Sequence, residues 1–366
     1  MNSRRQLVLR VEVGMTVSQA CRLAGVTRKT GRKWLRRASE DGPVNLSERS
    51  RAPKTIWRTP DLVEEALLQM KEAFPEWGAK KLVVKLEEDI GLILPLRTAD
   101  RILARHGLTT PRVKASEAEP IRFQRDRSGA LLQMDFKGLP ISTPYCLLTV
   151  LDDCDRFCHM FAPLVDKTGA SVKAALWTLF GEHGLPDEML MDNGDCWRAG
   201  GSSKGPTQFE AWLMRLGVKP IHGRPYHPQT QGKVERFHLT AKKEMGDNLL
   251  QPSIELARKA CTAFVDRYNW ERPHESLGMQ VPGSLYAPWP RKRPELPPAH
   301  EPESGAILRK VDDKGIFRFK GDDYLLGKGL YRESIVIKEA EFGMRVFYAG
   351  FALPYLRELN HARSEK

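Results

Sequence analysis

Residues 128–288 alternate short apolar runs with longer amphipathic stretches, and few folds accommodate this order. Runs rich in apolar and β-branched residues predict strands, whereas apolar residues that recur every three or four positions predict helices. The predicted strands are 131–137, 145–152, 157–165, 188–191 and 218–221, and the predicted helices are 171–183, 208–216 and 231–245. The sequence therefore predicts an α/β domain whose first strands are antiparallel.

Three carboxylates occupy distinctive places in this pattern. Asp135 lies within the first predicted strand, Asp192 ends a later one, and Glu235 lies in the first turns of the last helix. If the two strands are neighbours and the helix packs across them, the three side chains converge. Carboxylate oxygens suit Mg²⁺, and two such ions about 4 Å apart would activate the attacking oxygen and stabilise the leaving oxygen at phosphorus.

The helix predicted for 231–245 can stay packed while it presents Glu235, because its apolar stripe and its polar face are separate. The stripe comprises Val234, Phe237, Ala241 and Met245, and the polar face comprises Glu235, His238 and Lys242. Basic residues beside Glu235 would either meet DNA phosphates or form an ordinary solvated face; they are Lys233, Arg236, Lys242 and Lys243.

Positive charge is concentrated at the front of the chain. The whole sequence has 58 Lys and Arg against 46 Asp and Glu, a net charge of +12. Residues 1–58 hold 14 basic and four acidic residues, so 14 minus 4 gives +10 in this segment alone. A concentrated positive module gains affinity for a polyanion by releasing counterions, which makes nucleic acid the expected partner. A membrane surface fits less well because no strong hydrophobic face opposes these charges.

A helix-turn-helix pattern lies within this basic segment. Apolar spacing over 16–24 and a basic stretch over 28–37 predict two helices, Thr16 and Thr27 are plausible N-caps, and Gly25 supplies the sharp turn. The predicted DNA contacts of the second helix are Arg28, Lys29, Arg32, Lys33 and Arg36. The alternative is a solvated basic face on a small helical bundle.

A second helical bundle is predicted between residues 61 and 107. Its helices should span 61–74 and 79–89, with a third after Pro95. Arg97, Arg101 and Arg105 are spaced four residues apart and share one face of the third helix. Arg97 and Arg101 are predicted DNA contacts, and a purely structural bundle is the alternative.

Three connectors, at 39–60, 109–127 and 288–302, divide the chain. The predicted domains are 1–40, 60–108, 128–288 and 304–360. The last connector has six prolines in fifteen residues and little to bury, so an extended spacer is expected. Short predicted strands at 306–311, 316–319, 334–337 and 344–348 indicate a small C-terminal β-barrel, which would bind DNA or a neighbouring subunit or serve only for packing.

Several function classes find no support in the sequence. No apolar run approaches the roughly 20 residues of a membrane span, and the N-terminus has no signal-peptide pattern, so a cytoplasmic location is expected. The six cysteines have neither zinc nor disulfide spacing and should be mostly buried thiols. Without a phosphate-cradling Gly-x-x-x-x-Gly-Lys-Ser/Thr loop, ATP hydrolysis is not expected.

Two further polar groups have alternative interpretations. Asp152, Asp153 and Asp155 could offer metal oxygens, but they follow a predicted strand and are better explained as a hairpin turn. His222 and His227 could ligate a metal, yet no cysteine pair accompanies them. Support of the active-site wall or contact with DNA is favoured for the histidines, with a structural role as the alternative.

Four motifs resemble one protein family. They are QMDF at 133–136, MDNG at 191–194, HGRPYHPQTQGKVERF at 222–237 and YNWERPHESLG at 268–278. They are similar to the integrase-core transposases of bacterial insertion sequences, which are related to retroviral integrases and share the ribonuclease-H-like fold. The C-terminal strands are similar to the small barrel of some members. The N-terminal zinc-binding His/Cys module of retroviral integrases is absent.

The resemblance implies that Asp135, Asp192 and Glu235 are a catalytic triad that holds two Mg²⁺ ions, with Mn²⁺ as a substitute. It implies hydrolysis at the element's 3′ ends, then transfer of the 3′-hydroxyls into target DNA by a homo-multimer on paired ends. One departure is the gap of 42 residues between Asp192 and Glu235, lengthened by a glycine-rich insertion at 198–206. The alternatives are a nuclease of the same fold and an inactive DNA-binding protein derived from a transposase.

Overall fold

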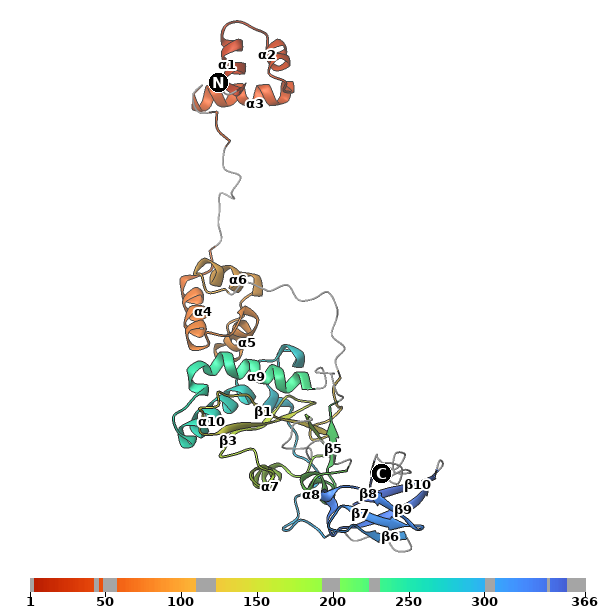
Figure 1. Ribbon diagram of the computed structural model, residues 1–366. Helices are drawn as coiled ribbons and strands as arrows, with labels where there is room; N and C mark the ends of the chain where they lie inside the picture. Colours follow the sequence, from red (N-terminus) through yellow and green to blue (C-terminus); the bar gives the residue numbers. More distant parts are fainter. Residues whose placement is uncertain are drawn as a thin grey trace. The chain divides into compact units, whose positions relative to one another are not determined.

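The computed structural model describes residues 3–42, 46–48, 58–109, 123–192, 205–223, 231–299, 307–340 and 343–353. The chain forms two compact units, residues 1–59 and 60–366. The first unit contains three helices, α1 (Ser3–Glu12), α2 (Val17–Leu23) and α3 (Arg28–Asp41), which Figure 1 shows in red. Helices α2 and α3 confirm the predicted helix-turn-helix, whereas α1 has no counterpart in the sequence prediction.

The turn between α2 and α3 follows from its residue types. Thr16 and Thr27 cap the two helices with their side chains, as predicted. Gly25 has a φ of +64°, in the left-handed region that glycine adopts most easily. A Cβ on Gly31 would come within 2.1 Å of Cys21 Sγ, so the absence of a side chain there lets α3 pack closely against α2.

The second unit begins with the predicted helical bundle. Its helices are α4 (Asp61–Ala73), α5 (Ala79–Ile90) and α6 (Leu96–Arg105), close to their predicted bounds. Leu67, Leu82 and Ile102, one from each helix, meet in a buried cluster with Trp77. The bundle therefore has its own apolar core.

A five-stranded sheet forms the centre of the second unit. Its strands are β1 (Leu131–Lys137), β2 (Cys146–Asp152), β3 (Cys158–Leu164), β4 (Glu188–Met191) and β5 (Lys219–His222). They lie in the order β3-β2-β1-β4-β5. The first three strands pair antiparallel and β4 pairs parallel to β1 and β5, so the predicted mixed α/β core is confirmed.

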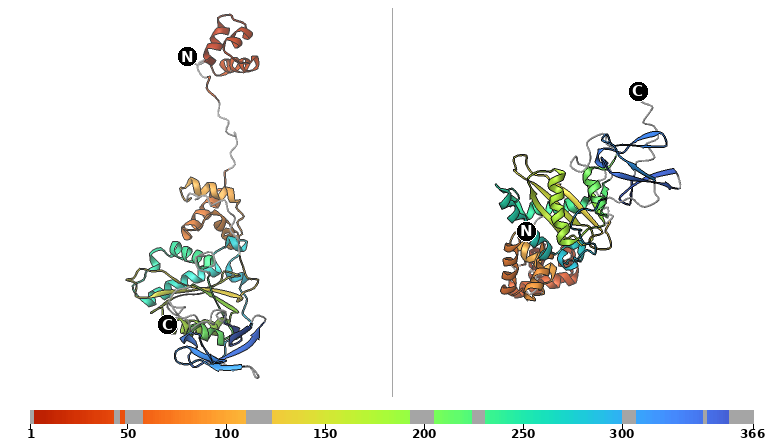
Figure 2. Two further views of the ribbon diagram at one scale, coloured as in Figure 1. Left: turned by 45° about the vertical axis from the view of Figure 1, so that its right-hand side comes forward. Right: turned by 90° about the horizontal axis from the view of Figure 1, so that it is seen from below.

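Helices cover both faces of this sheet. The apolar residues of α7 (Gly169–His183) and α8 (Gln208–Arg215) pack with Leu132 and Met134 of β1 on one face. Those of α9 (Gly232–Met245) and α10 (Ile254–Trp270) pack with Leu147 and Leu151 of β2 on the other. Figures 1 and 2 show α9 and α10 in cyan on the opposite side of the sheet from the yellow-green α7.

Helix α10 is an element that the sequence prediction lacks. It has 17 residues, and Phe264 and Tyr268 bury its apolar side against α9. None of the helices in the described ranges is both long enough and apolar enough to cross a bilayer. The second unit also has short helical turns, which are η2 (Gly246–Leu249), η3 (Glu275–Leu277), α11 (Pro282–Leu285) and η4 (Lys328–Leu330).

The C-terminal strands form two sheets. The four predicted strands are present, and β6 (Ile307–Lys310), β9 (Ser334–Ala340), β10 (Gly343–Tyr348) and β11 (Phe351–Ala352) pair in one sheet, whereas β7 (Ile316–Phe319) and β8 (Asp322–Leu325) pair in the other. Strand pairing among the described residues closes no barrel, so only the antiparallel β part of that prediction is confirmed. Ala211 and Met214 of α8 belong to the same apolar cluster as these strands. The C-terminal module thus packs against α8 of the α/β core.

The connector after residue 288 differs from the predicted spacer. Trp289 is 5% exposed and packs in the same cluster as β1 and α7. Arg291 donates to the backbone oxygen of Gly217 at 2.8 Å, and its own oxygen accepts from Leu185 N at 2.7 Å. The prediction that this segment buries little is therefore wrong for its first residues. A single large aromatic residue among prolines is enough to fasten the segment to the core.

Replacing Trp289 with alanine should destabilise the second unit by about 3 kcal/mol, because it removes a fully packed aromatic side chain. Chemical denaturation followed by circular dichroism measures the change. Leu296 lies in the same proline-rich segment and is 78% exposed, so Leu296→Ala is the matched control. Equal stability of the two variants would contradict the anchoring role of Trp289.

Candidate active site

The sheet register brings Asp135 and Asp192 to one place. Strands β1 and β4 run parallel, and Met134 pairs with Met191. The residues that follow this pair are Asp135 and Asp192, so the two carboxylates leave adjacent strands at the same level. Parallel neighbours hold such positions about 5 Å apart across the sheet. The sequence interpretation required these two strands to be neighbours, and the sheet meets that condition.

Glu235 approaches from the helix that crosses this point. It is the fourth residue of α9 and is exposed. Just before α9, the side chain of Gln231 donates to the backbone oxygen of Met134 at 3.4 Å. The start of the helix therefore lies over the β1 residue that immediately precedes Asp135.

The three carboxylates interact electrostatically. Burial, together with the negative charges of Asp192 and Glu235, raises the pKa of Asp135 from 3.8 to about 6, although a hydrogen bond from Phe136 N and the charge of Lys167 lower it. This repulsion is what a divalent cation between the groups would relieve. The chemistry of the donor set therefore fits a hard metal ion that prefers oxygen ligands.

The side chains do not form a finished ligand set. Within the described ranges, no three His, Cys, Asp or Glu side chains come close enough together to hold one metal ion. The backbone places Asp135, Asp192 and Glu235 near one another, and the metal site stays a prediction. Asn193, Gly194, His227 and most of the insertion at 198–206 lie outside the described residues.

A histidine stands beside Asp135. His238 of α9 has its Nδ1 3.8 Å from Asp135 Oδ2, and its Nε2 is hydrogen-bonded to Thr149 Oγ1 at 2.8 Å. Burial, reinforced by the charge of Lys137, lowers the pKa of His238 to about 4. The imidazole is therefore neutral at physiological pH and can carry its proton on either nitrogen.

A second histidine supports Asp192. His222, at the end of β5, donates from Nδ1 to the backbone oxygen of Asp192 at 3.1 Å, and its Nε2 lies 2.7 Å from Glu210 Oε1. Glu210 also accepts from Thr207 N in the capping box of α8. His222 thus ties the end of β4 to α8. This placement matches the predicted support of the site wall.

The acidic cluster after β2 is a turn, as predicted. Residues 153–155 form the turn between β2 and β3. Asp152 accepts from Gly129 N and Cys154 N, both at 2.7 Å, and Asp155 accepts from Phe157 N at 2.8 Å. Each of these two carboxylates accepts from at least one backbone amide. Asp153 has a different set of partners, which the sequence interpretation missed.

Asp153 connects β1 with the start of α9. Its carboxylate accepts from Gln133 Nε2 at 2.9 Å and forms an ion pair with Lys233. Lys233 also donates to the backbone oxygen of Asp153 at 2.8 Å. Gln133 in turn accepts from Val234 N at 3.3 Å. The signal in the sequence was a glutamine placed between the apolar residues Leu132 and Met134.

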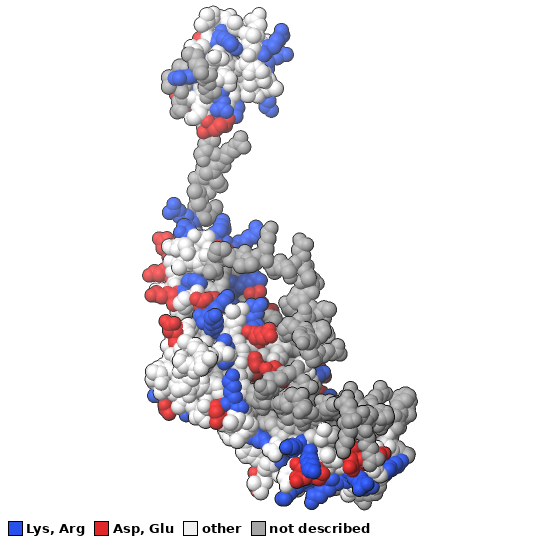
Figure 3. Space-filling model, in the orientation of Figure 1, with Lys and Arg blue, Asp and Glu red and all other residues white. Residues whose placement is uncertain are grey.

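The residues predicted to contact DNA differ in how far their side chains are exposed to solvent. The five residues of α3 are exposed, as are the two of α6 and two of the three on α9. The exposed residues are Arg28, Lys29, Arg32, Lys33, Arg36, Arg97, Arg101, Arg236 and Lys242. Lys233 is only 18% exposed in its side chain and faces Asp153. Figure 3 shows Lys and Arg side chains on the visible faces of both units.

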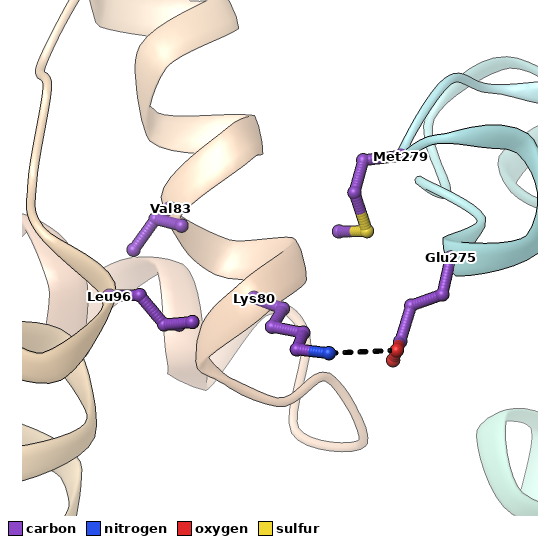
Figure 4. A pocket seen from close by; sticks show the side chains of 5 residues that line it. All are labelled: Lys80, Val83, Leu96, Glu275 and Met279. Atoms are coloured by element: carbon purple, nitrogen blue, oxygen red, sulfur yellow. Dashed lines mark hydrogen bonds and ion pairs between the residues drawn. The ribbon is translucent and has the colours of Figure 1, made fainter.

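The helical bundle is fastened to the catalytic core near the far end of α9. Glu244 accepts from Trp77 Nε1 at 3.2 Å and from Arg272 Nε at 2.7 Å. Beside this contact, an open cavity of about 340 Å³ contains an ion pair of 3.0 Å between Lys80 and Glu275 (Figure 4). The bundle therefore contacts the same helix that carries Glu235.

The cysteines have the environment that the sequence suggests. Cys21, Cys146, Cys158 and Cys261 are buried free thiols, and Cys154 is partly exposed. Cys196 lies outside the described residues. Burial raises the pKa of Cys261 to about 12, so this thiol is not nucleophilic at neutral pH.

Family models match most of the predicted organisation. Two models described as Integrase core domain match residues 125–228 and 216–282. A Helix-turn-helix domain matches residues 3–54, and a Homeodomain-like domain matches residues 30–103. The catalytic core and both helical regions are covered.

Curated relatives are transposases. The chain is 23% identical over 97% of its length to a protein of Geobacillus stearothermophilus described as a transposase for insertion sequence element IS5376, of which it covers 86%. It is 29% identical over 26% of its length to the InsD transposase of insertion element IS2D from Escherichia coli, of which it covers 30%.

Solved structures with a similar chain are retroviral integrases. The catalytic core domain of BIV integrase shares 21% identity and a TM-score of 0.34, and the match covers 43% of this chain and 93% of that one. The HTLV-2 core, solved in complex with magnesium, shares 16% identity and a TM-score of 0.34 over 44% of this chain and 97% of that one.

The matched integrase core is that of a DDE transposase family enzyme. More particularly, the chain is an insertion-sequence transposase with an integrase core domain and helix-turn-helix DNA-binding domains. Members of the integrase-core family use a divalent metal.

Asp135→Asn should stabilise the protein in a chelator at pH 7.5. Folding raises the pKa of Asp135 above 3.8, so stability is lost as pH rises from about 4 through about 6. The difference between a pKa of 3.8 and one of about 6 corresponds to a change of at most about 3 kcal/mol in the free energy of unfolding, and solvent screening reduces this to roughly 1–2 kcal/mol. Asparagine keeps the oxygen that accepts from Phe136 N.

The measurement is the thermal midpoint at pH 7.5 and at pH 4. The gain should be present at the higher pH and vanish at the lower one. Asp126→Asn, at an exposed position, is the control and should not move the midpoint. A gain that persists unchanged at pH 4 would rule out charge repulsion as its cause.

Proposed function

We propose that this transposase cleaves the 3′ ends of its element and transfers them into target DNA. One observation carries the proposal. Asp135 and Asp192 directly follow Met134 and Met191, which pair across the parallel strands β1 and β4, and Glu235 lies on the helix that crosses these strands. Three carboxylates from three elements are suited to phosphoryl transfer, whose catalysis depends on positioning and charge stabilisation.

Asp135, Asp192 and Glu235 would hold two Mg²⁺ ions, with Mn²⁺ as an alternative. Such ions supply charge for the scissile phosphate and lower the pKa of a bound water or 3′-hydroxyl. The protein's own contribution is placement. β1 and β4 fix two carboxylates at one level, while His238 lies beside Asp135 and His222 binds the backbone oxygen of Asp192. The apolar layers of α7 and α9 keep the sheet rigid beneath the site.

DNA binding would be divided among three basic surfaces. Helix α3 is the recognition helix, whose exposed basic residues read base edges and phosphates in the major groove. Arg97 and Arg101 of α6 would contact phosphates, as would Arg236 and Lys242 near Glu235. Lys233 belongs to the same predicted set, although it faces Asp153. A homo-multimer on paired element ends and a location in the bacterial cytoplasm stay predictions.

Asp135→Asn, Asp192→Asn and Glu235→Gln should each abolish strand transfer. Each change removes a metal-ligand charge but little volume, so we expect a loss of at least about 100-fold. The assay joins labelled element ends, taken from the DNA that flanks the gene, to a plasmid in Mg²⁺. DNA affinity should stay within about twofold of wild type, because loss of a catalytic carboxylate removes no phosphate contact.

The assay also separates the alternatives. Cleavage of the ends without joined product would identify a nuclease of the same fold. Full activity in any one of the three variants would overturn the triad. If the wild-type protein binds the ends but neither cleaves nor joins them with Mg²⁺ or Mn²⁺, the chain would instead be an inactive DNA-binding protein derived from a transposase.

Arg32→Ala should weaken binding to element ends about eightfold at 0.1 M salt, if Arg32 makes one phosphate contact. The slope of log K against log salt should then fall by about 0.9. Fluorescence anisotropy across a salt series gives both values. Arg258→Ala, at an exposed position on α10, is the control and should leave both unchanged. An unchanged slope for Arg32→Ala would remove α3 from the phosphate-binding surface.

A further inference from the structure

The start of α9 lacks the usual cap. The residue before the helix, Gln231, makes no side-chain cap hydrogen bond. The first backbone amides of a helix have no partner within the helix, and a capping side chain normally accepts from the third of them. In α9 the third residue is Val234, immediately before Glu235.

A side chain from the sheet takes the place of that cap. Gln133 of β1 is 2% exposed, and its Oε1 accepts from Val234 N at 3.3 Å. Gln133 and Asp135 are two residues apart on one strand, so their side chains face the same side of the sheet. The strand that presents Asp135 therefore also holds the amide next to Glu235.

The other end of the glutamine is fixed by a buried charge. Gln133 Nε2 donates to Asp153 Oδ1 at 2.9 Å, and Asp153 is 5% exposed. Asp153 also pairs with Lys233, whose Nζ donates to the Asp153 backbone oxygen at 2.8 Å. Since Lys233 and Val234 are consecutive residues, the contacts close a ring that joins β1, the turn after β2 and the first turn of α9.

This ring leaves Lys233 little freedom for a second task. Its side chain is 18% exposed, and it holds both the carboxylate and the backbone oxygen of Asp153. Lys242, on the same helix, is exposed to solvent and can contact the phosphates of bound DNA. Lys233 and Lys242 therefore have different environments.

We propose that Lys233, Asp153 and Gln133 are positioning residues that set the place of Glu235 relative to Asp135. In this arrangement Lys233 acts through Asp153 and is not a DNA contact. The proposal rests on the proposed function only in that Glu235 is taken as a catalytic carboxylate. A displacement of about 1 Å at such a site can cost roughly 100-fold in rate.

A double-mutant cycle tests the coupling. Lys233→Met and Asp153→Asn should each lower the strand-transfer rate constant about 30- to 100-fold. The rate constant of the double variant should be no lower than that of the less active single variant. Lys233→Arg, which keeps the ion pair, should recover much of the rate. Lys259→Met, at an exposed position on α10, is the matched control and should keep wild-type activity. Multiplying losses in the double variant would overturn the proposal.

DNA binding separates this role from phosphate contact. Lys233→Met should leave both the affinity for element ends and its salt slope unchanged, whereas a phosphate-binding lysine would lower the slope by about 0.9 when replaced. A lowered slope would make Lys233 a DNA contact and overturn the proposal.

Hydrogen exchange gives a readout that needs no activity. In a chelator, Asp153→Asn should speed exchange of the Val234 amide at least about tenfold, because loss of the ion pair with Lys233 loosens the first turn of α9. Lys259→Met should not change it, and circular dichroism verifies that both variants are folded. Unchanged exchange in Asp153→Asn would overturn the ring. Activity retained by Glu235→Gln would instead overturn the proposed function, and the exchange result would still stand.

Discussion

The parallel pairing of β1 with β4 is the interaction on which the active site depends. Because Met134 lies opposite Met191, the next residue of each strand carries a carboxylate at the same level. A shift of the register by one residue would turn one of these side chains to the other face of the sheet. The apolar clusters on both faces prevent such a shift, since it would expose residues such as Leu132 and bury charge.

Polar groups then fix what the sheet alone cannot. A strand sets the direction of Asp135, but the helix that brings Glu235 could slide along its own axis. Gln231, Gln133 and the pair of Lys233 with Asp153 bind the first turn of α9 to β1. At its other end, Glu244 binds Trp77 and Arg272. Buried charges are costly unless they are paired, and the buried carboxylates of Asp153 and Glu244 are paired with Lys233 and Arg272.

The order of strands and helices in the core could be predicted from the sequence, because each element carries its own periodicity. The strand of Asp135 and the helix of Glu235 have nearly their predicted bounds. The helix-turn-helix was predictable for the same reason, since Thr16, Gly25 and Thr27 act locally. Helix α10 was not predicted, although its sequence has a similar apolar spacing.

Contacts between distant residues could not be predicted, because they depend on register and packing. The sequence interpretation assigned Lys233 to DNA, whereas its neighbour in the fold is Asp153, 80 positions away. Trp289 looked like part of a spacer because prolines surround it, and only the apolar layer of β1 and α7 shows what it packs against. Closure of the C-terminal strands into a barrel likewise depends on long-range pairing, and the described strands form two sheets.

The shared core of α8 and the C-terminal strands changes how that module relates to catalysis. Ala211 and Met214 lie in the C-terminal cluster, while Leu213 lies in the cluster under β1. Arg215 and Glu333 add an ion pair of 3.4 Å across this boundary. Helix α8 also carries Glu210, which binds His222, and His222 binds the backbone oxygen of Asp192. A continuous series of contacts through one short helix therefore links the C-terminal sheets with the backbone of Asp192.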